Sequence, residues 1–485
     1  MKLLATALAV LLTLLTARAA RAQAPDWHGA HLLQGLSGTA QPTATAIDAQ
    51  GNVYVAGTFY GTAQLGSTAL ESAGEDDIFI AKWSATTQRI AWAMQMGSLG
   101  RANLYALSVQ GSSVYVLGAL MAPYTGSDRF VENGEAFDSF VTKLIDGGTH
   151  ATAAWTHHLG SPAALAEPVA LAVQGAAVFV LGNGYGSVAR TNHAASAAGD
   201  SVTHFLTKIL EAGPAPHVAW THEWATTDPN YTLQTLAVQG PRLYMAANTW
   251  HDVPHEIGPL PYGPQLSRTA ATHNQLTITR YTDAGTACRP GWTWHDAGLA
   301  NALAVSGPNV YVVGYSGAAA TFGHGAVPPG SHDVEGDMFI GKLVEHDTTA
   351  RLGWVQRLPT TGYYPGTCLS GVAVRGTHLW VAGTYAGPRI QFGATLLTNQ
   401  GTGSNRTPDV VVAELTDAGS TARFEWARSA GGTGADAITE LAVLNDKAYL
   451  IGTLSAAPVR LGKDTLEFEG DNDGVLFWAW LPLSK

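Results

Sequence analysis

Carboxylates are the first side chains in this sequence that could do chemistry, and they recur just before short apolar segments. The positions are Glu75-Asp76-Asp77, Asp138, Glu335 with Asp337, Asp409, and Asp471-Asn472-Asp473. Such groups suit Ca²⁺, but no segment has the full ligand spacing and glycine of a calcium loop. We favour a simpler interpretation, in which an aspartate caps a turn where a strand begins. We therefore predict no metal site and no cofactor, with Ca²⁺ at these segments as the alternative.

Aromatic residues form a second candidate set. They gather at the start of long connections, at Phe59, Tyr60, Tyr124, Tyr185, Trp250, Tyr315 and Tyr385, and in another connection at Tyr363 and Tyr364. Aromatic faces bind the apolar side of sugars, so these residues are our candidate surface for a glycan or protein ligand. The structural alternative, which we favour, is that the rings pack the ends of the sheets.

Histidines and cysteines suggest no catalytic group. The closest histidines, His157-His158 and His217 with His222, lie in strand-like segments, where adjacent side chains point to opposite faces. The sequence has no Gly-x-Ser-x-Gly nucleophile elbow on a strand–turn–helix. Cys288 and Cys368 are expected on opposite faces of the molecule and hence unpaired. We predict no catalytic residue.

A repeat explains these recurrences. Seven copies of a short alternating strand are offset by 61 to 69 residues, at 53–57, 114–118, 178–182, 243–247, 310–314, 379–383 and 448–452. A short apolar strand and a tight turn, which mostly contains glycine, precede each copy. A third strand follows, often with a lysine that we expect to reach the rim. Repeats of this kind indicate a solenoid or a propeller.

A tryptophan marks the fourth strand of the first six units, at Trp92, Trp155, Trp220, Trp292 or Trp294, Trp354 and Trp426. The seventh unit has no fourth strand, but residues 25–34 are unmatched and contain Trp27. We predict an all-β, seven-bladed propeller with four antiparallel strands per blade. Its ring is closed by the N-terminal strand in the last blade. Each fourth-strand tryptophan should wedge between neighbouring blades.

The predicted domain organisation is one propeller after a signal peptide. Residues 1–22 have a basic start, an apolar run and a small-x-small end, and 23–485 form a single domain. The closing strand is 25–34, and the blades are approximately 43–97, 104–160, 168–224, 232–297, 299–359, 368–432 and 438–481. Removing Lys2, Arg18 and Arg21 with the peptide would take the net charge from −11 to −14. This acidity argues against nucleic acid as a partner.

The unit resembles the bacterial SBBP-type β-propeller repeat. In the first blade the resemblance rests on residues 48–59, 65–74 and 77–82. It implies an extracellular propeller of the kind found in secreted and cell-surface proteins, including ones called S-layer-like, and it transfers no catalytic residue. Blades 3 and 4 are degenerate, because Ala247 replaces the repeat glycine and no aspartate precedes the third strand at 276–281.

The predicted function is a secreted or cell-surface, non-catalytic binding, adhesion or surface-layer module. We expect a monomer without a transmembrane segment, which binds its ligand on the face that carries the long loops. One alternative is an extracellular enzyme on polysaccharide, with its site at the mouth of the axial channel. A remote alternative is a quinone-dependent oxidoreductase, because segment 283–286 before Trp292 weakly resembles a quinoprotein repeat.

Overall fold

The structure is a computed structural model. It describes residues 24–32, 36–38, 40–97, 100–123, 131–132, 135–159, 165–185, 202–212, 215–226, 228, 230–250, 274–316, 337–359, 367–401, 407–456, 458–467 and 475–483. The predicted signal peptide lies outside the described residues. So do Tyr124, Tyr363, Tyr364, Glu335 and the segment 471–473.

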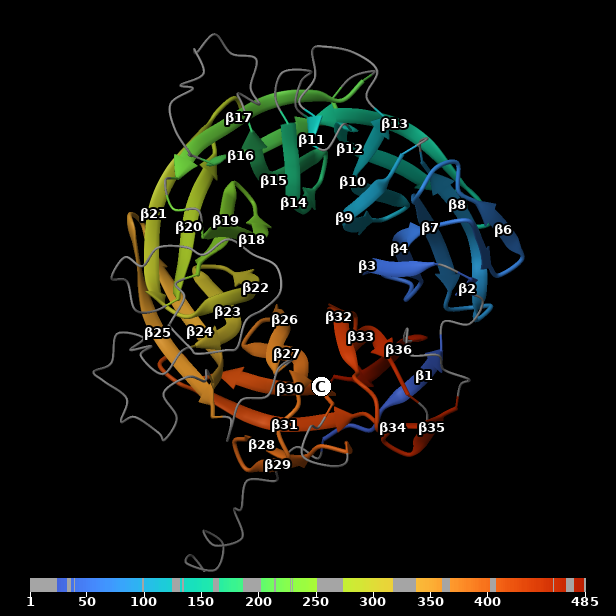
Figure 1. The fold of residues 1–485 in the computed structure, drawn as a ribbon. Helices are drawn as coiled ribbons and strands as arrows, with labels where there is room; N and C mark the ends of the chain where they lie inside the picture. Colours follow the sequence, from blue (N-terminus) through green and yellow to red (C-terminus); the bar gives the residue numbers. More distant parts are fainter. Residues whose placement is uncertain are drawn as a thin grey trace, which may run out of the picture.

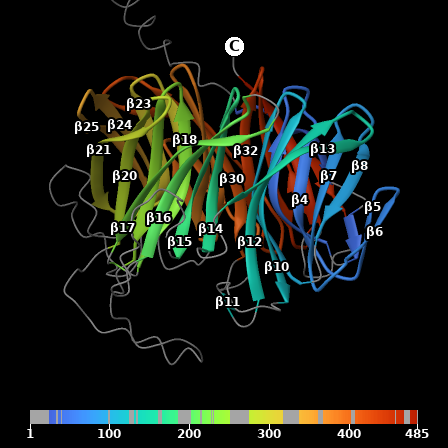
Figure 2. The same cartoon turned by 90° about the horizontal axis from the view of Figure 1, so that it is seen from above.

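Seven antiparallel sheets stand side by side in a ring, and the predicted seven-bladed propeller is confirmed (Figure 1). The strands run from one face of the ring to the other (Figure 2). Blades 1 to 4 are, from the axis outward, β3 (Gln41–Ile47), β4 (Val53–Phe59), β7 (Asp77–Ser84), β8 (Arg89–Met96); β9 (Ala102–Gln110), β10 (Ser113–Pro123), β12 (Glu135–Asp146), β13 (Ala151–Leu159); β14 (Leu165–Gln174), β15 (Ala177–Tyr185), β16 (Val202–Leu210), β17 (His217–Thr226); and β18 (Tyr231–Gln239), β19 (Arg242–Thr249), β20 (Gln275–Asp283), β21 (Cys288–Ala297).

The remaining blades follow the same order. Blades 5 to 7 are β22 (Leu299–Ser306), β23 (Asn309–Ser316), β24 (Asp337–His346), β25 (Thr349–Leu358); β26 (Cys368–Arg375), β27 (His378–Tyr385), β30 (Asp409–Asp417), β31 (Ala422–Ala430); and β32 (Ala437–Leu444), β33 (Lys447–Leu454), β36 (Val475–Pro482), β1 (His28–Leu32). Short extra strands are β2 (Leu36–Gly38), β5 (Thr62–Leu65), β6 (Thr68–Glu71), β11 (Val131–Glu132), β28 (Arg389–Phe392), β29 (Thr395–Thr398), β34 (Val459–Leu461) and β35 (Asp464–Leu466).

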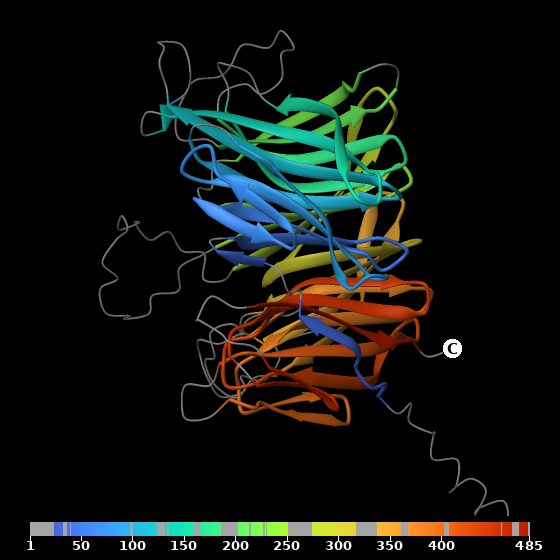
Figure 3. The same ribbon diagram turned by 90° about the vertical axis from the view of Figure 1, so that its right-hand side faces the viewer.

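The ring is closed as predicted, because the N-terminal strand β1 pairs antiparallel with β36. His28 lies opposite Trp480 and Leu32 opposite Phe477. Figure 3 shows this blue strand against the red strands of blade 7. Arg428 of blade 6 also holds the chain just before β1. Its guanidinium donates to the carbonyls of Ala24 and Pro25 and to the Asp26 carboxylate.

Trp27 packs in the core between blades 6 and 7, in agreement with the prediction of a tryptophan wedged between neighbouring blades. Unlike the fourth-strand tryptophans of blades 1 to 6, it lies at the junction with the preceding blade and not with the next one. Where other blades pair the fourth-strand tryptophan with the third-strand base, β1 pairs His28 with Trp480, and a bulge at Gly29 and Ala30 separates this pair from that of His31. A Cβ on Gly29 would lie 2.6 Å from Nε1 of Trp480. At the closing junction, between blades 7 and 1, the third strand therefore supplies the indole that the fourth strand lacks.

The hydrophobic core lies between the blades. The second strand of each blade is buried on both faces, as Val53–Phe59 illustrates, because a neighbouring sheet covers each side. This double burial explains why the repeat strand is continuously apolar. Six fourth-strand tryptophans lie at the junction with the next blade as predicted, and in blade 4 the residue is Trp292.

Every innermost strand carries a bulge at the same level. The register skips one residue in each, at Thr43, Tyr105, Val169, Gln234, Asn301, Ser370 and Thr439. Several of these side chains reach the next blade. Asn301 donates to the Leu369 carbonyl and Ser370 to the Ile438 carbonyl. The bulges thus add polar links around the axis, where adjacent blades come closest.

We predict that Gly29→Ala destabilises the protein more than Gly111→Ala. Both glycines have positive φ, 54° and 62°, so both substitutions incur the left-handed cost of about 1–2 kcal/mol. Only Gly29 faces a side chain within 4 Å, because nothing lies near a Cβ on Gly111. Overpacking against Trp480 should add about 1–3 kcal/mol, measured by urea denaturation. Equal losses in the two variants would contradict the tight closing junction.

Candidate functional site

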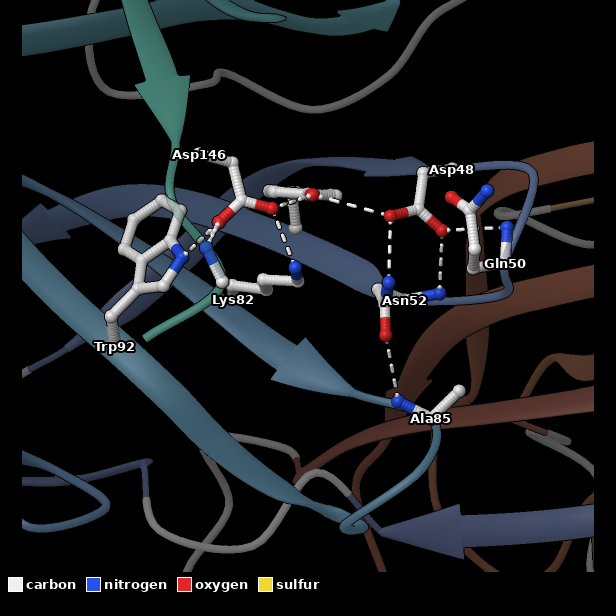
Figure 4. A network of polar contacts seen from close by, with 9 residues as sticks. Asp48, Gln50, Asn52, Lys82, Ala85, Trp92 and Asp146 are labelled. Atoms are coloured by element: carbon white, nitrogen blue, oxygen red, sulfur yellow. Dashed lines mark hydrogen bonds and ion pairs between the residues drawn. The ribbon is translucent and has the colours of Figure 1, made fainter. Parts of the chain in front are cut away.

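Acidic side chains of one blade contact basic, tyrosine and tryptophan side chains of the preceding blade at the junctions between blades. Asp146, at the end of the third strand of blade 2, accepts hydrogen bonds from three side chains of blade 1 (Figure 4). The donors are Tyr54 Oη at 2.7 Å, Lys82 Nζ at 2.5 Å and Trp92 Nε1 at 2.8 Å. The Tyr54 hydroxyl also lies 3.2 Å from Asp48, which caps the first turn of blade 1.

The same arrangement recurs at four further junctions. In each, a carboxylate of one blade is contacted by a base on the third strand of the preceding blade. The pairs are Lys143 with Glu211 at 2.7 Å, Lys208 with Asp283 at 2.5 Å, Arg280 with Glu345 at 2.8 Å, and Lys342 with Asp417 at 2.6 Å. The tryptophans Trp220, Trp292 and Trp354 donate to the last three of these carboxylates.

These clusters correct the expectation for the third-strand lysines. Lys82, Lys208 and Lys342 are buried between blades and do not extend to the rim. Burial alone would raise the pKa of Asp146, but hydrogen bonds from Lys82, Tyr54, the Gly148 amide and Trp92 outweigh it. Together they hold that pKa at about 2. Each of these five carboxylates contacts a base of the preceding blade and so joins two blades.

Two junctions depart from the pattern, and both involve blade 7. In blade 7, Trp480 occupies the third-strand position of the base. Leu483 occupies the position of the carboxylate that accepts the hydrogen bonds in other blades. In blade 6 Glu414 replaces the base. It accepts a hydrogen bond from Trp426 Nε1 at 2.5 Å, and His378 Nδ1 lies 2.7 Å from its other oxygen. Glu414, His378 and Trp426 all belong to blade 6, so this cluster lies within one blade, unlike the base–acid pairs of the other junctions.

We predict that Asp146→Ala lowers stability by about 3–5 kcal/mol at neutral pH, because it leaves the buried Lys82 ammonium without its partner. The lowered pKa of Asp146 means that the wild type holds this stability above pH 4 and loses it as the pH falls toward 2. The difference between variant and wild type in urea denaturation should therefore shrink over that range. Glu425→Ala, which breaks a more exposed pair with Arg423, is the control. A loss under 1 kcal/mol for Asp146→Ala would contradict the role of the cluster.

The acidic segments before the third strands behave as turn and strand caps. Asp77 accepts from the Ala73 amide at 3.0 Å, and Asp409 accepts from the Gln400 amide at 2.6 Å. Both aspartates are completely buried. In blades 2 and 5 the equivalent residues face bases on the fourth strand, Asp138 with His158 at 3.0 Å and Asp337 with Arg357 at 3.5 Å.

Asp436, in the link between blades 6 and 7, is a functional candidate that the sequence analysis missed. Its carboxyl is 1% exposed and accepts from the amides of Gly432 and Ser455. Burial raises its pKa to about 7, and the nearby Asp409 carboxylate adds to the rise. Two neighbouring carboxyls are reminiscent of an acid–base pair, but Asp436 and Asp409 are both enclosed, so a polymer substrate could not reach them.

We predict that Asp436→Asn changes how stability depends on pH. The folded protein keeps a proton on Asp436 that the unfolded chain releases, so stability falls as the pH rises from about 4 to 7. Asparagine cannot lose that proton. The melting temperature of the variant minus that of the wild type should therefore be more positive at pH 8 than at pH 5. Asp76→Asn, at a more exposed acid, is the control. A difference that is constant with pH would contradict a proton held at Asp436.

The candidate aromatic residues divide according to a one-residue offset in the repeat. Tyr60 and Trp250 follow the second strand directly and are 54% and 47% exposed. Tyr385 stands one position earlier, level with Phe59, and both are buried. Tyr315 is half-buried in β23, and Tyr185 ends β15 at the same repeat position as Tyr60. Successive side chains of a strand point to opposite faces. An aromatic side chain one position earlier in the repeat therefore points the opposite way.

The remaining predicted groups stay apart. Cys288 and Cys368 are both free. His157 and His158 are adjacent in β13, and only His158 contacts Asp138. Across the described ranges, no three histidine, cysteine, aspartate or glutamate side chains are grouped so as to hold a metal ion. Within the same ranges, no helix is long and apolar enough to cross a membrane.

The chain is a seven-bladed β-propeller. Its clusters of buried acidic and basic side chains lie between the blades. No protein-family model matches the chain, and no curated protein matches it. Among solved structures it is similar to the phage phi92 endosialidase at 10% identity. The match covers 95% of this chain and 70% of that one, with a TM-score of 0.40. A likeness at this level concerns the fold alone.

Proposed function

We propose that the protein is a secreted or cell-surface binding module that holds an extended glycan on its loop face. The observation that carries the proposal is the exposure of Tyr60 and Trp250 at equivalent positions of two blades. Each follows the second strand and so begins a two-to-three connection on the same face of the ring. Exposed rings held at strand ends are suited to stack on the apolar faces of sugars.

The spacing of the two rings favours a long ligand. Tyr60 follows β4 of blade 1, and Trp250 follows β19 of blade 4, on the opposite side of the ring (Figure 1). One small sugar could not contact both residues, whereas a polymer lying across the face could. The blades beneath are joined by buried charged clusters, so the two rings stand on a rigid frame.

The secreted location and the SBBP-type repeat belong to the same proposal. They rest on the apolar N-terminal segment and on the repeat residues of blades 1 and 6, respectively. An export signal would place the acidic mature chain outside the cell, where polysaccharides are abundant. The rigid ring with varied loops suits adhesion or a surface-layer role in that setting.

We predict that Trp250→Ala and Tyr60→Ala each weaken glycan binding about tenfold, which corresponds to about 1.4 kcal/mol per ring. A glycan array with the mature wild type would identify the ligand, and titration calorimetry would then compare the variants. Leu396→Ala, which removes another exposed apolar side chain, is the matched control and should bind normally. Absence of glycan binding by the wild type, or unchanged affinity in both aromatic variants, would contradict the proposal.

A further inference from the structure

The two exposed rings of the proposed glycan site have different polar surroundings. Trp250 lies against the link that joins blade 3 to blade 4, because its backbone amide donates to the Asn230 carbonyl at 3.1 Å. Next to Tyr60, in contrast, Gly61 is bonded to Ser72 of the same connection through both its amide and its carbonyl. A polar link between two blades therefore lies beside Trp250, where strands β18 and β19 adjoin (Figure 1).

This link carries two polar side chains, Asp228 and Asn230. Oδ1 of Asp228 accepts from the Asn230 amide at 3.0 Å, and the Asp228 carbonyl accepts from the Tyr231 amide at 3.2 Å, so the turn is held from within. Both side chains are half-buried. Within the described residues, Oδ2 of Asp228 and the side-chain amide of Asn230 make no hydrogen bond. A carboxylate oxygen and an amide beside an exposed indole are suited to bind adjacent hydroxyls of a sugar.

Aromatic rings of blade 3 support this link from beneath. The ring of Tyr231, the first residue of β18, lies 5.0 Å from that of His204, and the His204 ring lies 5.5 Å from that of Trp224. His204 and Trp224 pair across the third and fourth strands of blade 3. At the same level of blade 1 the pair is aliphatic, Ile78 with Met96. Blade 3 thus places large, stiff rings where blade 1 has flexible chains, which favours a fixed position for the link.

The charge beside Trp250 is negative. Within the described residues, no lysine or arginine forms an ion pair with Asp228. The bases on the third strands of blades 3 and 4 are already paired, Lys208 with Asp283 at 2.5 Å and Arg280 with Glu345 at 2.8 Å. A sugar carboxylate placed beside Asp228 would be repelled, whereas a sugar hydroxyl can donate a charge-assisted hydrogen bond to it. The charge therefore favours an uncharged sugar over a uronic or sialic acid.

We propose that Trp250, Asp228 and Asn230 form a subsite that selects an uncharged pyranose unit with two adjacent hydroxyls. Within the glycan-binding function proposed above, on which this subsite rests, the sugar ring stacks on the Trp250 indole. One hydroxyl donates to the Asp228 carboxylate, and the side-chain amide of Asn230 donates to the neighbouring hydroxyl. Asp228 determines the specificity, because its charge excludes anionic units. Tyr60 adds stacking to a distant part of the same polymer.

The test compares neutral and anionic polysaccharides as ligands of the mature wild type. The neutral probes are soluble β-glucan, galactomannan and xylan, and the anionic probes are polygalacturonate, alginate and polysialic acid. We expect binding to at least one neutral probe, and affinity for every anionic probe that is weaker by about tenfold or more, the equivalent of about 1.4 kcal/mol. Wild-type binding to an anionic probe as tightly as to the best neutral probe would overturn the proposal.

Titration calorimetry of variants then tests the individual residues. Asp228→Asn keeps an acceptor for the Asn230 amide, and hence the turn, but removes the charge. It should weaken binding of the best neutral probe about fivefold and reduce the preference over the anionic probes by a similar factor. Asn230→Ala should weaken binding about fivefold without changing that preference. Asp446→Asn removes a charge from an exposed tight turn between β32 and β33, so it is the matched control and should bind as the wild type does.

The outcomes separate this subsite from the wider function. If Trp250→Ala loses binding while Asp228→Asn and Asn230→Ala both keep wild-type affinity and preference, the subsite is wrong and the glycan-binding function stands. If no probe binds the wild type, both proposals are overturned. Melting temperatures show that the variants are folded. If Asp228→Asn melts lower than the wild type, Asp228→Ser, whose hydroxyl also caps such turns, provides the same comparison.

Discussion

The buried carboxylate that joins one blade to the next is the interaction on which the ring depends. A charge between two sheets is costly unless it is paired and hydrogen-bonded. Asp146 is satisfied only when Tyr54, Lys82 and Trp92 of the neighbouring blade are in place. Because the donors come from three strands and the acceptor from another sheet, one cluster sets the distance and the register between two blades. Its recurrence around the ring sets the geometry of most of the molecule.

The interactions change at blade 7, where the two ends of the chain meet. Trp480 and His28 replace the base and the fourth-strand tryptophan, so the closing junction is sealed by aromatic packing. His28 stacks on Trp480 at 4.8 Å, and Lys447 lies 4.0 Å above the same ring. A non-covalent closure loses the conformational entropy of the chain end that it orders. The hydrogen bonds from Arg428 to residues 24–26 offset part of that cost.

These constraints shape where function can lie. The acids, bases and indoles buried between the blades hold the frame together and are occupied by one another. Aromatic side chains at strand ends are instead exposed, as Tyr60 and Trp250 are. A frame with strong junctions can present such residues with little loss of conformational entropy on binding, which favours recognition.

The sequence by itself determined the strands, their number per blade and the closing role of the N-terminal segment, because local alternation and the repeat period carry that information. It also contained the base and the acid of the third strands of blades 2 to 5, as in Lys143 and Asp146, three residues apart. Only the tertiary structure decided that Lys143 contacts blade 3 and Asp146 contacts blade 1. The reason is that side chains alternate along a strand, so these two point to different faces of the blade. The same physical reason separates Tyr385 from Tyr60, since a single residue of offset in a strand exchanges core for solvent. The side on which Trp27 packs likewise depends on which blade lies next to it, and the chain order does not specify that contact.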